Sequence, residues 1–301
     1  MFKKLFGNKY SKWILLVLFL LGVALADYFL HNYYNIRGYR GAIVGEKQKG
    51  EYRIACFGGS TTYGFGVEES ESWPAQLQQQ LGAYYTVINL GTNNQGIYGI
   101  SHDIEYYEDL NFDMAILYQG ETDRDPSQLL EYNFRGGDPF FYLFGYKTSL
   151  GFYIKNIVLK MTPEHKNESR PVFKNKESNE SQQAKVNQHY LDADLIAKEM
   201  MKKGQKPYAG YIEKMDKVLY KLCSKKIKTL LVCPPNAFSS IQQYLVRQLI
   251  DAKYLGKVEY LSLNDLFPNL NEVSFDGMHL KKEGYEKVAD EIKREIFKKN
   301  K

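Results

Sequence analysis

The sequence contains few of the residues from which disulfide scaffolds and metal sites are built. It has 3 cysteines and 5 histidines among 301 residues. Three cysteines exclude a small domain held together by disulfide bonds, and no cysteine or histidine spacing typical of a metal site occurs. We therefore expect no metal and no cofactor. With 44% hydrophobic and 25% charged residues, the composition is instead that of a folded globular protein.

The chain also has little net charge once its first residues are set aside. The formal net charge is +5, and residues 1–26 contribute four lysines and no acidic residue, which leaves +1 for the rest. A face that binds nucleic acid needs clustered positive charge. The sequence therefore predicts no nucleic-acid partner.

Only one long apolar run is present, and it lies near the N-terminus. Residues 13–26 read WILLVLFLLGVALA and follow the lysines, which is the pattern of a secretory signal. Fourteen residues are fewer than the roughly 20 that cross a bilayer, but extension to Leu30 adds only one charge, Asp27. Two hypotheses stay open: cleavage after Ala26, or a retained single-pass membrane helix. Both place the chain from Asp27 onward outside the cytoplasmic membrane, on the periplasmic or cell-surface side.

The remainder alternates short apolar runs with amphipathic segments. This alternation predicts α/β architecture with a mostly parallel five-stranded sheet covered on both faces. Residues 1–30 are expected to be the signal or anchor, 31–50 a linker that packs onto the domain, and 51–301 one domain. The expected strands are 52–57, 85–89, 113–118, 228–233 and 257–263; the expected helices are 72–81, 100–110, 207–226, 236–254 and 284–297.

An insertion at about residues 124–206 interrupts this alternation. Residues 139–153 are rich in aromatic side chains, and residues 163–185 are polar enough to be expected mobile. The aromatic part is interpreted either as the core of the insertion or as a lid that contacts an acyl chain or a membrane.

Polar, glycine-rich loops follow the predicted strands at the sheet edge where sites form in open parallel sheets. They span 57–66, 89–94 and 118–123, and a further loop at 274–279 precedes the last helix. The first loop is not a phosphate-binding P-loop, because Phe65 stands where that motif needs lysine. It is not a hydrolase elbow GxSxG either, because Thr62 replaces the second glycine. What remains is Ser60 after two glycines at the end of a buried strand.

A serine nucleophile needs a base, and the few histidines restrict the choice. His279 is the only one with a carboxylate three residues away in a short glycine-containing loop. Asp276 can accept the Nδ1–H of His279, which leaves Nε2 to take the proton of Ser60. We therefore predict a catalytic triad of Ser60, Asp276 and His279.

The blocks FGGST, NLG, GETD and DGMHL occur in the order and approximate spacing of the SGNH, or GDSL-like, hydrolases. The chain resembles that superfamily, specifically its membrane-anchored bacterial branch, over roughly residues 51–298. The resemblance implies that Ser60 is the nucleophile and that the backbone N–H groups of Ser60 and Gly91 stabilise the oxyanion. It also implies that Asp276 and His279 complete the triad.

The third block departs from the family pattern Gly-x-Asn-Asp, in which the asparagine is the third oxyanion donor. Thr122 stands at that position in this chain. Its hydroxyl can donate but is shorter than an amide. Gln119, Asn93 and Asn94 are the alternative donors.

The interpretation that follows is a flavodoxin-like three-layer α/β/α domain with a Ser-His-Asp acyl-enzyme mechanism. We expect an extracytoplasmic serine esterase acting on acetyl or short acyl esters of a small molecule or a surface polysaccharide. The alternatives are an O-acyltransferase on a cell-surface glycan, with a sugar hydroxyl in place of water, and a weakly active glycan-binding module, which Thr122 motivates.

Overall fold

The computed structural model describes residues 9–33, 39–42, 44–120, 122–129, 192–235 and 239–298. The chain divides into two units, one formed by Met1–Gly38 with Gly137–Ser169 and the other by Tyr39–Gly136 with Arg170–Lys301. Most of the predicted insertion, including residues 139–153 and 163–185, lies outside the described residues.

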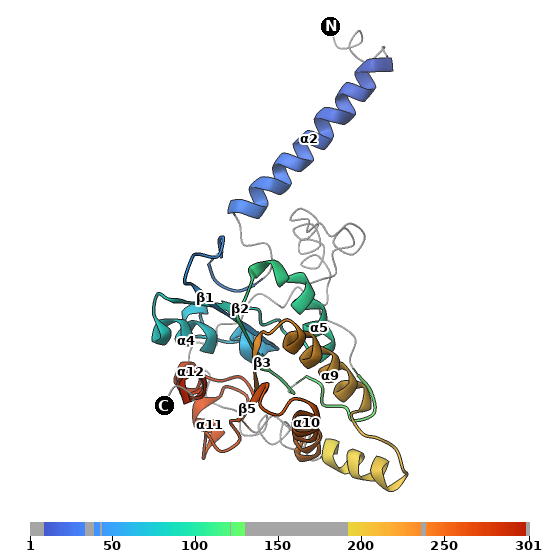
Figure 1. Ribbon diagram of the computed structural model, residues 1–301, viewed down its shortest axis with the longest axis vertical. Coiled ribbons are helices and arrows are strands. Elements are labelled where there is room, and N and C mark those ends of the chain that lie inside the picture. The colour runs from blue at the N-terminus through green and yellow to red at the C-terminus, as the bar shows by residue number, and fades with distance from the viewer. Residues whose placement is uncertain are drawn as a thin grey trace. The chain divides into compact units, whose positions relative to one another are not determined.

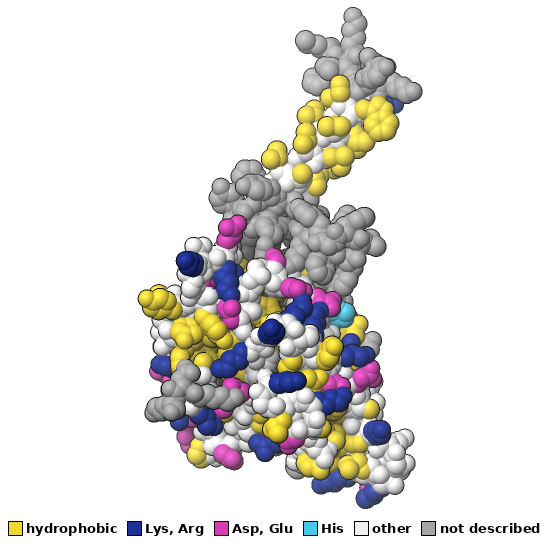
Figure 2. Space-filling model, in the orientation of Figure 1, with side chains coloured by type: hydrophobic (Ala, Val, Ile, Leu, Met, Phe, Trp, Pro, Cys, Tyr) yellow, Lys and Arg dark blue, Asp and Glu magenta, His cyan; other side chains and the backbone are white. Residues whose placement is uncertain are grey.

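The described part of the first unit is helix α2, Lys9–Tyr33 (Figure 1). Large hydrophobic side chains from Trp13 to Leu21 are exposed along it, and Figure 2 shows them gathered there. The prediction that the N-terminal apolar run is helical is confirmed. No helix in the described part of the chain combines the length and the apolar character needed to cross a membrane.

The second unit is built on a sheet of five strands that are all parallel to their neighbours. The strands lie in the order β2-β1-β3-β4-β5. The connection after β1 leads to one edge of the sheet, and all later connections lead toward the other edge, so β1 and β3 flank the switch point of the topology. Sites form at such a switch point in open α/β sheets. The strands are β1 (Tyr52–Gly58), β2 (Tyr85–Asn89), β3 (Met114–Tyr118), β4 (Lys228–Cys233) and β5 (Val258–Ser262).

Helices form the outer layers of this α/β/α arrangement (Figure 1). Helices α4 (Trp73–Leu81) and α12 (Lys282–Phe297) pack against each other and share one core with alternate residues of the strands, such as Ile54 and Ile116. Helix α9 (Ala209–Ser224) packs on β4, on α5 (Ile97–Tyr106) and on α10 (Ser240–Lys253). The predicted three-layer sheet architecture is therefore confirmed.

Several boundaries differ from the prediction. Helix α5 begins at Ile97 rather than at residue 100, and the last predicted turn is a separate 3-10 helix, Glu108–Leu110. Two short helices were not expected, α3 (Ser60–Tyr63) and α11 (Leu270–Val273). Ser72 is the N-cap of α4 as expected, but its hydroxyl donates to the Glu69 carbonyl at 2.8 Å and does not cap the helix.

Candidate active site

Ser60 lies just beyond the carboxyl end of β1, the strand between β2 and β3 in the sheet. Gly58 ends the strand, Gly59 is the N-cap of α3, and Ser60 is the first residue of that single helical turn. Its N–H therefore has no acceptor within the helix. A Cβ on Gly58 would lie 2.1 Å from Thr62 Oγ1 and 2.8 Å from the Tyr118 carbonyl oxygen, so only glycine fits where the strand turns into α3.

Asp276 and His279 lie in the loop between α11 and α12. An antiparallel bridge between Ser274 and Leu280 closes this loop, and the Phe275 N–H donates to the His279 carbonyl at 2.8 Å. The short span between these contacts orients both side chains toward the same side. The loop thus brings a carboxylate and an imidazole to the end of β1, although both residues lie more than 200 positions further along the sequence.

The three side chains form one hydrogen-bonded line. His279 Nε2 lies 2.8 Å from Ser60 Oγ, and His279 Nδ1 lies 2.7 Å from Asp276 Oδ2. The other carboxylate oxygen, Oδ1, accepts the backbone N–H groups of His279 at 2.8 Å and Met278 at 3.0 Å. The contacts predicted from the sequence are therefore present, and they are those of a serine nucleophile, a base and an orienting acid.

The surroundings keep Asp276 ionised. Burial alone raises the pKa of this carboxyl, but the hydrogen bonds and charge of the His279 side chain and the two backbone N–H groups outweigh burial and hold the pKa below its ordinary value. A carboxylate that stays charged fixes the tautomer of His279 with the proton on Nδ1. Nε2 is then free to accept the Ser60 proton.

An aromatic ring covers one side of the base. The Phe65 ring centroid lies 4.8 Å from that of His279, with an angle of 47° between the planes. Phe65 belongs to the turn that follows Ser60, so the same segment carries Ser60 and packs on His279.

The second loop does not present Gly91 as the resemblance implies. The Gly91 N–H donates to Asn89 Oδ1 at 3.0 Å, within its own loop. A Cβ on Gly91 would lie 2.2 Å from the Tyr63 backbone nitrogen and 2.6 Å from the Thr62 carbonyl carbon. Glycine is therefore needed at position 91 because the backbone passes close to the turn after Ser60. The bond of its N–H to Asn89 does not support Gly91 as the second oxyanion donor.

The candidates for the third oxyanion donor differ in burial and in hydrogen-bond partners. Thr122 is half-buried in the loop after β3, and among the described residues it takes no part in the hydrogen bonds that join Ser60, His279 and Asp276. Gln119 is buried and its amide donates to the neighbouring Tyr118 carbonyl at 3.1 Å, so this amide is turned toward its own strand. Asn94 is exposed with a φ of 57°, whereas Asn93 is half-buried. Thr122 and Asn93 thus remain the candidates.

A test of this site is the exchange of Thr122 for a longer donor. We expect Thr122→Asn to raise kcat and kcat/KM together by up to about 10-fold, because an added oxyanion donor acts in the transition state. Thr122→Val removes the hydroxyl at constant size and should lower both constants if that hydroxyl already donates. Steady-state kinetics on an acetyl ester measure both. If neither variant changes the rate, Thr122 has no oxyanion role and Asn93→Ala is the next comparison.

Asp123 is a residue of this site that the sequence did not single out. It is buried, and its Oδ2 accepts the Ile97 N–H at 2.7 Å, which joins the third loop to the start of α5. A Cβ on Gly96 would lie 2.5 Å from Asp123 Oδ1, so glycine makes room for the carboxyl. Burial raises the pKa of Asp123 to about 7, although the Ile97 N–H opposes the shift. The available signal was an acidic residue in the loop that follows the buried strand β3.

This carboxyl should make stability depend on pH. Between about pH 4 and pH 7 the folded protein retains the Asp123 proton while the unfolded chain has lost it, so stability falls as pH rises through that window. Asp123→Asn keeps an acceptor for Ile97 and carries no charge. In urea unfolding, the free energy of unfolding of the variant relative to that of the wild type should rise by about 1–4 kcal/mol between pH 4 and pH 8. The exposed Asp251→Asn is the control, and an equal pH dependence in all three proteins would reject the assignment.

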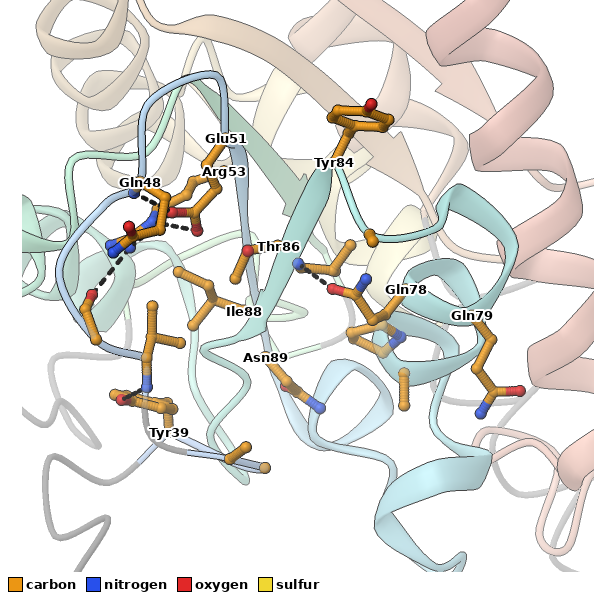
Figure 3. A pocket seen from close by; sticks show the side chains of 18 of the residues that line it. Tyr39, Gln48, Glu51, Arg53, Gln78, Gln79, Tyr84, Thr86, Ile88 and Asn89 are labelled. Carbon is orange, nitrogen blue, oxygen red and sulfur yellow. Dashed lines mark hydrogen bonds and ion pairs between the residues drawn. The ribbon is translucent and has the colours of Figure 1, made fainter. Parts of the chain in front are cut away.

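One cavity in the described part of the chain lies away from the triad. It has a volume of about 760 Å³ and runs beside the edge strand β2, between the segment 39–51 and helix α4 (Figure 3). Tyr39, Gln78 and Tyr84 are among its lining residues, and none of the triad residues is. Among the described residues, no group of three or more His, Cys, Asp or Glu is placed to hold a metal.

No family model matches the sequence, and no curated protein matches it. Solved structures similar to this chain include a putative lipolytic protein of the G-D-S-L family and an SGNH-hydrolase family esterase. A psychrotrophic esterase from Pseudoalteromonas sp. is 12% identical with a TM-score of 0.46, over 82% of this chain and 98% of that one. An SGNH-hydrolase family esterase is 16% identical with a TM-score of 0.40, over 85% and 98%. A carbohydrate acetylesterase family member from Sinorhizobium meliloti is 14% identical with a TM-score of 0.39, over 82% and 98%. With identities and TM-scores this low, an activity for this chain must be inferred from its own side chains.

Proposed function

We propose that the chain is a serine esterase of the SGNH type. The observation that carries the proposal is the line of hydrogen bonds from Asp276 through His279 to Ser60, with distances of 2.7 Å and 2.8 Å. This line joins residues from two segments that are more than 200 positions apart in the sequence. It is the arrangement that activates a hydroxyl for attack on a carbonyl carbon.

In the proposed reaction Ser60 Oγ attacks the ester carbonyl carbon while its proton moves to His279 Nε2. The tetrahedral intermediate collapses, the ester C–O bond breaks, and the alcohol leaves with the proton from His279. Water then attacks the acyl-enzyme and gives a proton to His279. The second collapse releases the carboxylic acid and returns the proton to Ser60. Asp276 remains charged throughout and stabilises the imidazolium.

The substrate that we propose is an acetyl or other short acyl ester, on a small molecule or on a surface polysaccharide. The resemblance of the sequence blocks supports this choice, and so does the position of the Phe65 ring against His279, where it restricts the space beside the base. Hydrolysis of p-nitrophenyl acetate faster than of p-nitrophenyl octanoate is the expected result. Faster cleavage of the longer ester would reject a short acyl group.

A fluorophosphonate probe tests the esterase proposal directly. The probe should form a covalent bond to Ser60 Oγ in the full-length protein, identified by mass spectrometry of the peptide that contains it. Ser60→Ala should not be labelled, and Thr61→Ser, which keeps a hydroxyl at the next position, should be labelled at residue 60 only. A wild-type protein that is folded and unlabelled would overturn the proposal.

We further propose that the enzyme works outside the cytoplasmic membrane. The lysines before Trp13, the apolar run that follows and the lack of lysine just after Ala26 support export. A C-terminal alkaline phosphatase fusion should be active, and a C-terminal green fluorescent protein fusion should stay dark. The opposite pair of results would refute export, and the size of the mature chain separates cleavage after Ala26 from a retained anchor.

A further inference from the structure

The segment at residues 39–51 packs on the domain although it precedes the first strand. Tyr39 is buried, and the Arg40 N–H donates to the Asn89 carbonyl at 3.0 Å, in an antiparallel bridge at the end of the edge strand β2. Lys47 forms an ion pair with Asp113 at 2.6 Å. Figure 3 shows the segment folded beside β2. It therefore packs onto the domain and belongs to the same unit as the sheet, which begins at Tyr39.

The side chain of Arg40 reaches the turn that follows Ser60. Its guanidinium donates to three backbone carbonyl oxygens, those of Tyr63 at 2.5 Å, Gly64 at 2.6 Å and Val67 at 2.7 Å. The guanidinium carbon also lies 4.5 Å from the centre of the Tyr63 ring. A planar group with five N–H donors can hold several carbonyls at once, and a lysine ammonium cannot reproduce this fork.

These carbonyls belong to the segment that we call the nucleophile turn, residues 60–67. Within it, the Ser60 carbonyl accepts the N–H groups of Gly64 and Phe65, both at 2.9 Å. Gly64 has a φ of 82°, and Phe65 packs on His279. The residues that bind Arg40 thus lie on both sides of Phe65. The nucleophile turn begins with Ser60, and Phe65, which contacts His279, lies further along the same turn.

We propose that Arg40 is a positioning residue for the nucleophile turn, so that the segment preceding the first strand is needed for an active triad. Arg40 acts through the backbone of residues 63–67, and it sets the place of Ser60 and of the Phe65 ring against His279. This inference rests on the proposed esterase function for its effect on rate. Its effect on the turn itself is independent of that function.

The test compares three variants of the full-length protein. Arg40→Met keeps the apolar stem and removes every donor, whereas Arg40→Lys keeps the charge. Lys47→Met is the matched control, because it removes a cation of the same segment whose partner, Asp113, precedes β3 and does not belong to the nucleophile turn. Two quantities are measured: the rate of fluorophosphonate labelling at Ser60, and hydrogen exchange in the peptide that covers residues 57–67.

We expect Arg40→Met to be labelled about 10–100-fold more slowly, because small displacements of a reacting group cost this much. Arg40→Lys should regain only part of the rate, and methylguanidinium added at low millimolar concentration should accelerate Arg40→Met. Amide exchange in the nucleophile turn should become faster. Lys47→Met should lose stability without a comparable loss of labelling, and its nucleophile turn should exchange as in the wild type.

Labelling of Arg40→Met at the wild-type rate would overturn the proposal. The proposal would also be overturned if Arg40→Met and Lys47→Met lowered the Tm equally and Arg40→Met slowed labelling no more than Lys47→Met did. If the wild type itself is not labelled, the esterase function fails, and hydrogen exchange still decides the role of Arg40. Unchanged exchange in the nucleophile turn of Arg40→Met would then reject it.

Discussion

Replacing Ser60 by alanine should lower kcat on an acetyl ester by about 10⁴–10⁶-fold, and His279→Ala should do the same. The double variant should be little worse than either single variant. Ser60 Oγ and His279 Nε2 are 2.8 Å apart and share one proton in the proposed step, so the loss of either atom disables both. Steady-state kinetics with purified proteins, after correction for the uncatalysed rate, give the three values.

The coupling between the two positions is the decisive quantity. If the losses multiply, the residues act independently and the triad assignment is wrong. Ser101→Ala is a suitable control, because its hydroxyl donates to the Tyr98 carbonyl in α5 at 2.6 Å, remote in sequence from both loops. Its activity should remain within about twofold of the wild type, as is usual for substitutions away from a site.

The sequence was sufficient to predict the sheet and the contacts between Ser60, His279 and Asp276, because both depend on strong local signals. Strands β2 and β4 have the predicted bounds, since each is a short run of mainly β-branched and apolar residues. His279 could be selected because only five histidines exist and one of them stands three residues after an aspartate. Parallel strands then place their carboxyl ends at one edge, which brings the two loops together.

The features that the sequence did not reveal depend on contacts between distant segments. Helix α5 begins at Ile97 because Asp123, from another loop, accepts that N–H. Arg40 shows no pattern with its neighbours, and its three acceptors lie 23 to 27 positions away. The expectation that Gly91 donates to the oxyanion came from a resemblance between short sequence blocks. Such a resemblance does not predict that the Asn89 side chain accepts the Gly91 N–H. Hydrogen bonds of this kind cannot be derived from periodicity or composition.

The substitution Gly91→Ala separates two explanations of that glycine. If Gly91 serves as an oxyanion donor through its N–H, alanine keeps the N–H and activity should fall only slightly. If Gly91 serves to let the second loop approach the nucleophile turn, alanine should be severe, because its Cβ would lie 2.2 Å from the Tyr63 nitrogen and 2.8 Å from the Tyr63 Cα. These are backbone atoms, and they can move only if the turn that carries Ser60 moves with them.

We therefore expect Gly91→Ala to lower kcat/KM and the rate of fluorophosphonate labelling by about 100-fold or more, with a lower Tm. Gly45→Ala is the matched control, because a Cβ there meets no atom within 4 Å and its φ is not in the left-handed region. Hydrogen exchange should show the disturbance of Gly91→Ala in residues 60–67, where the clash arises, and not in the sheet. An alanine variant within about threefold of the Gly45→Ala rate would reject the close-approach explanation, because the nucleophile turn would then have tolerated the added Cβ.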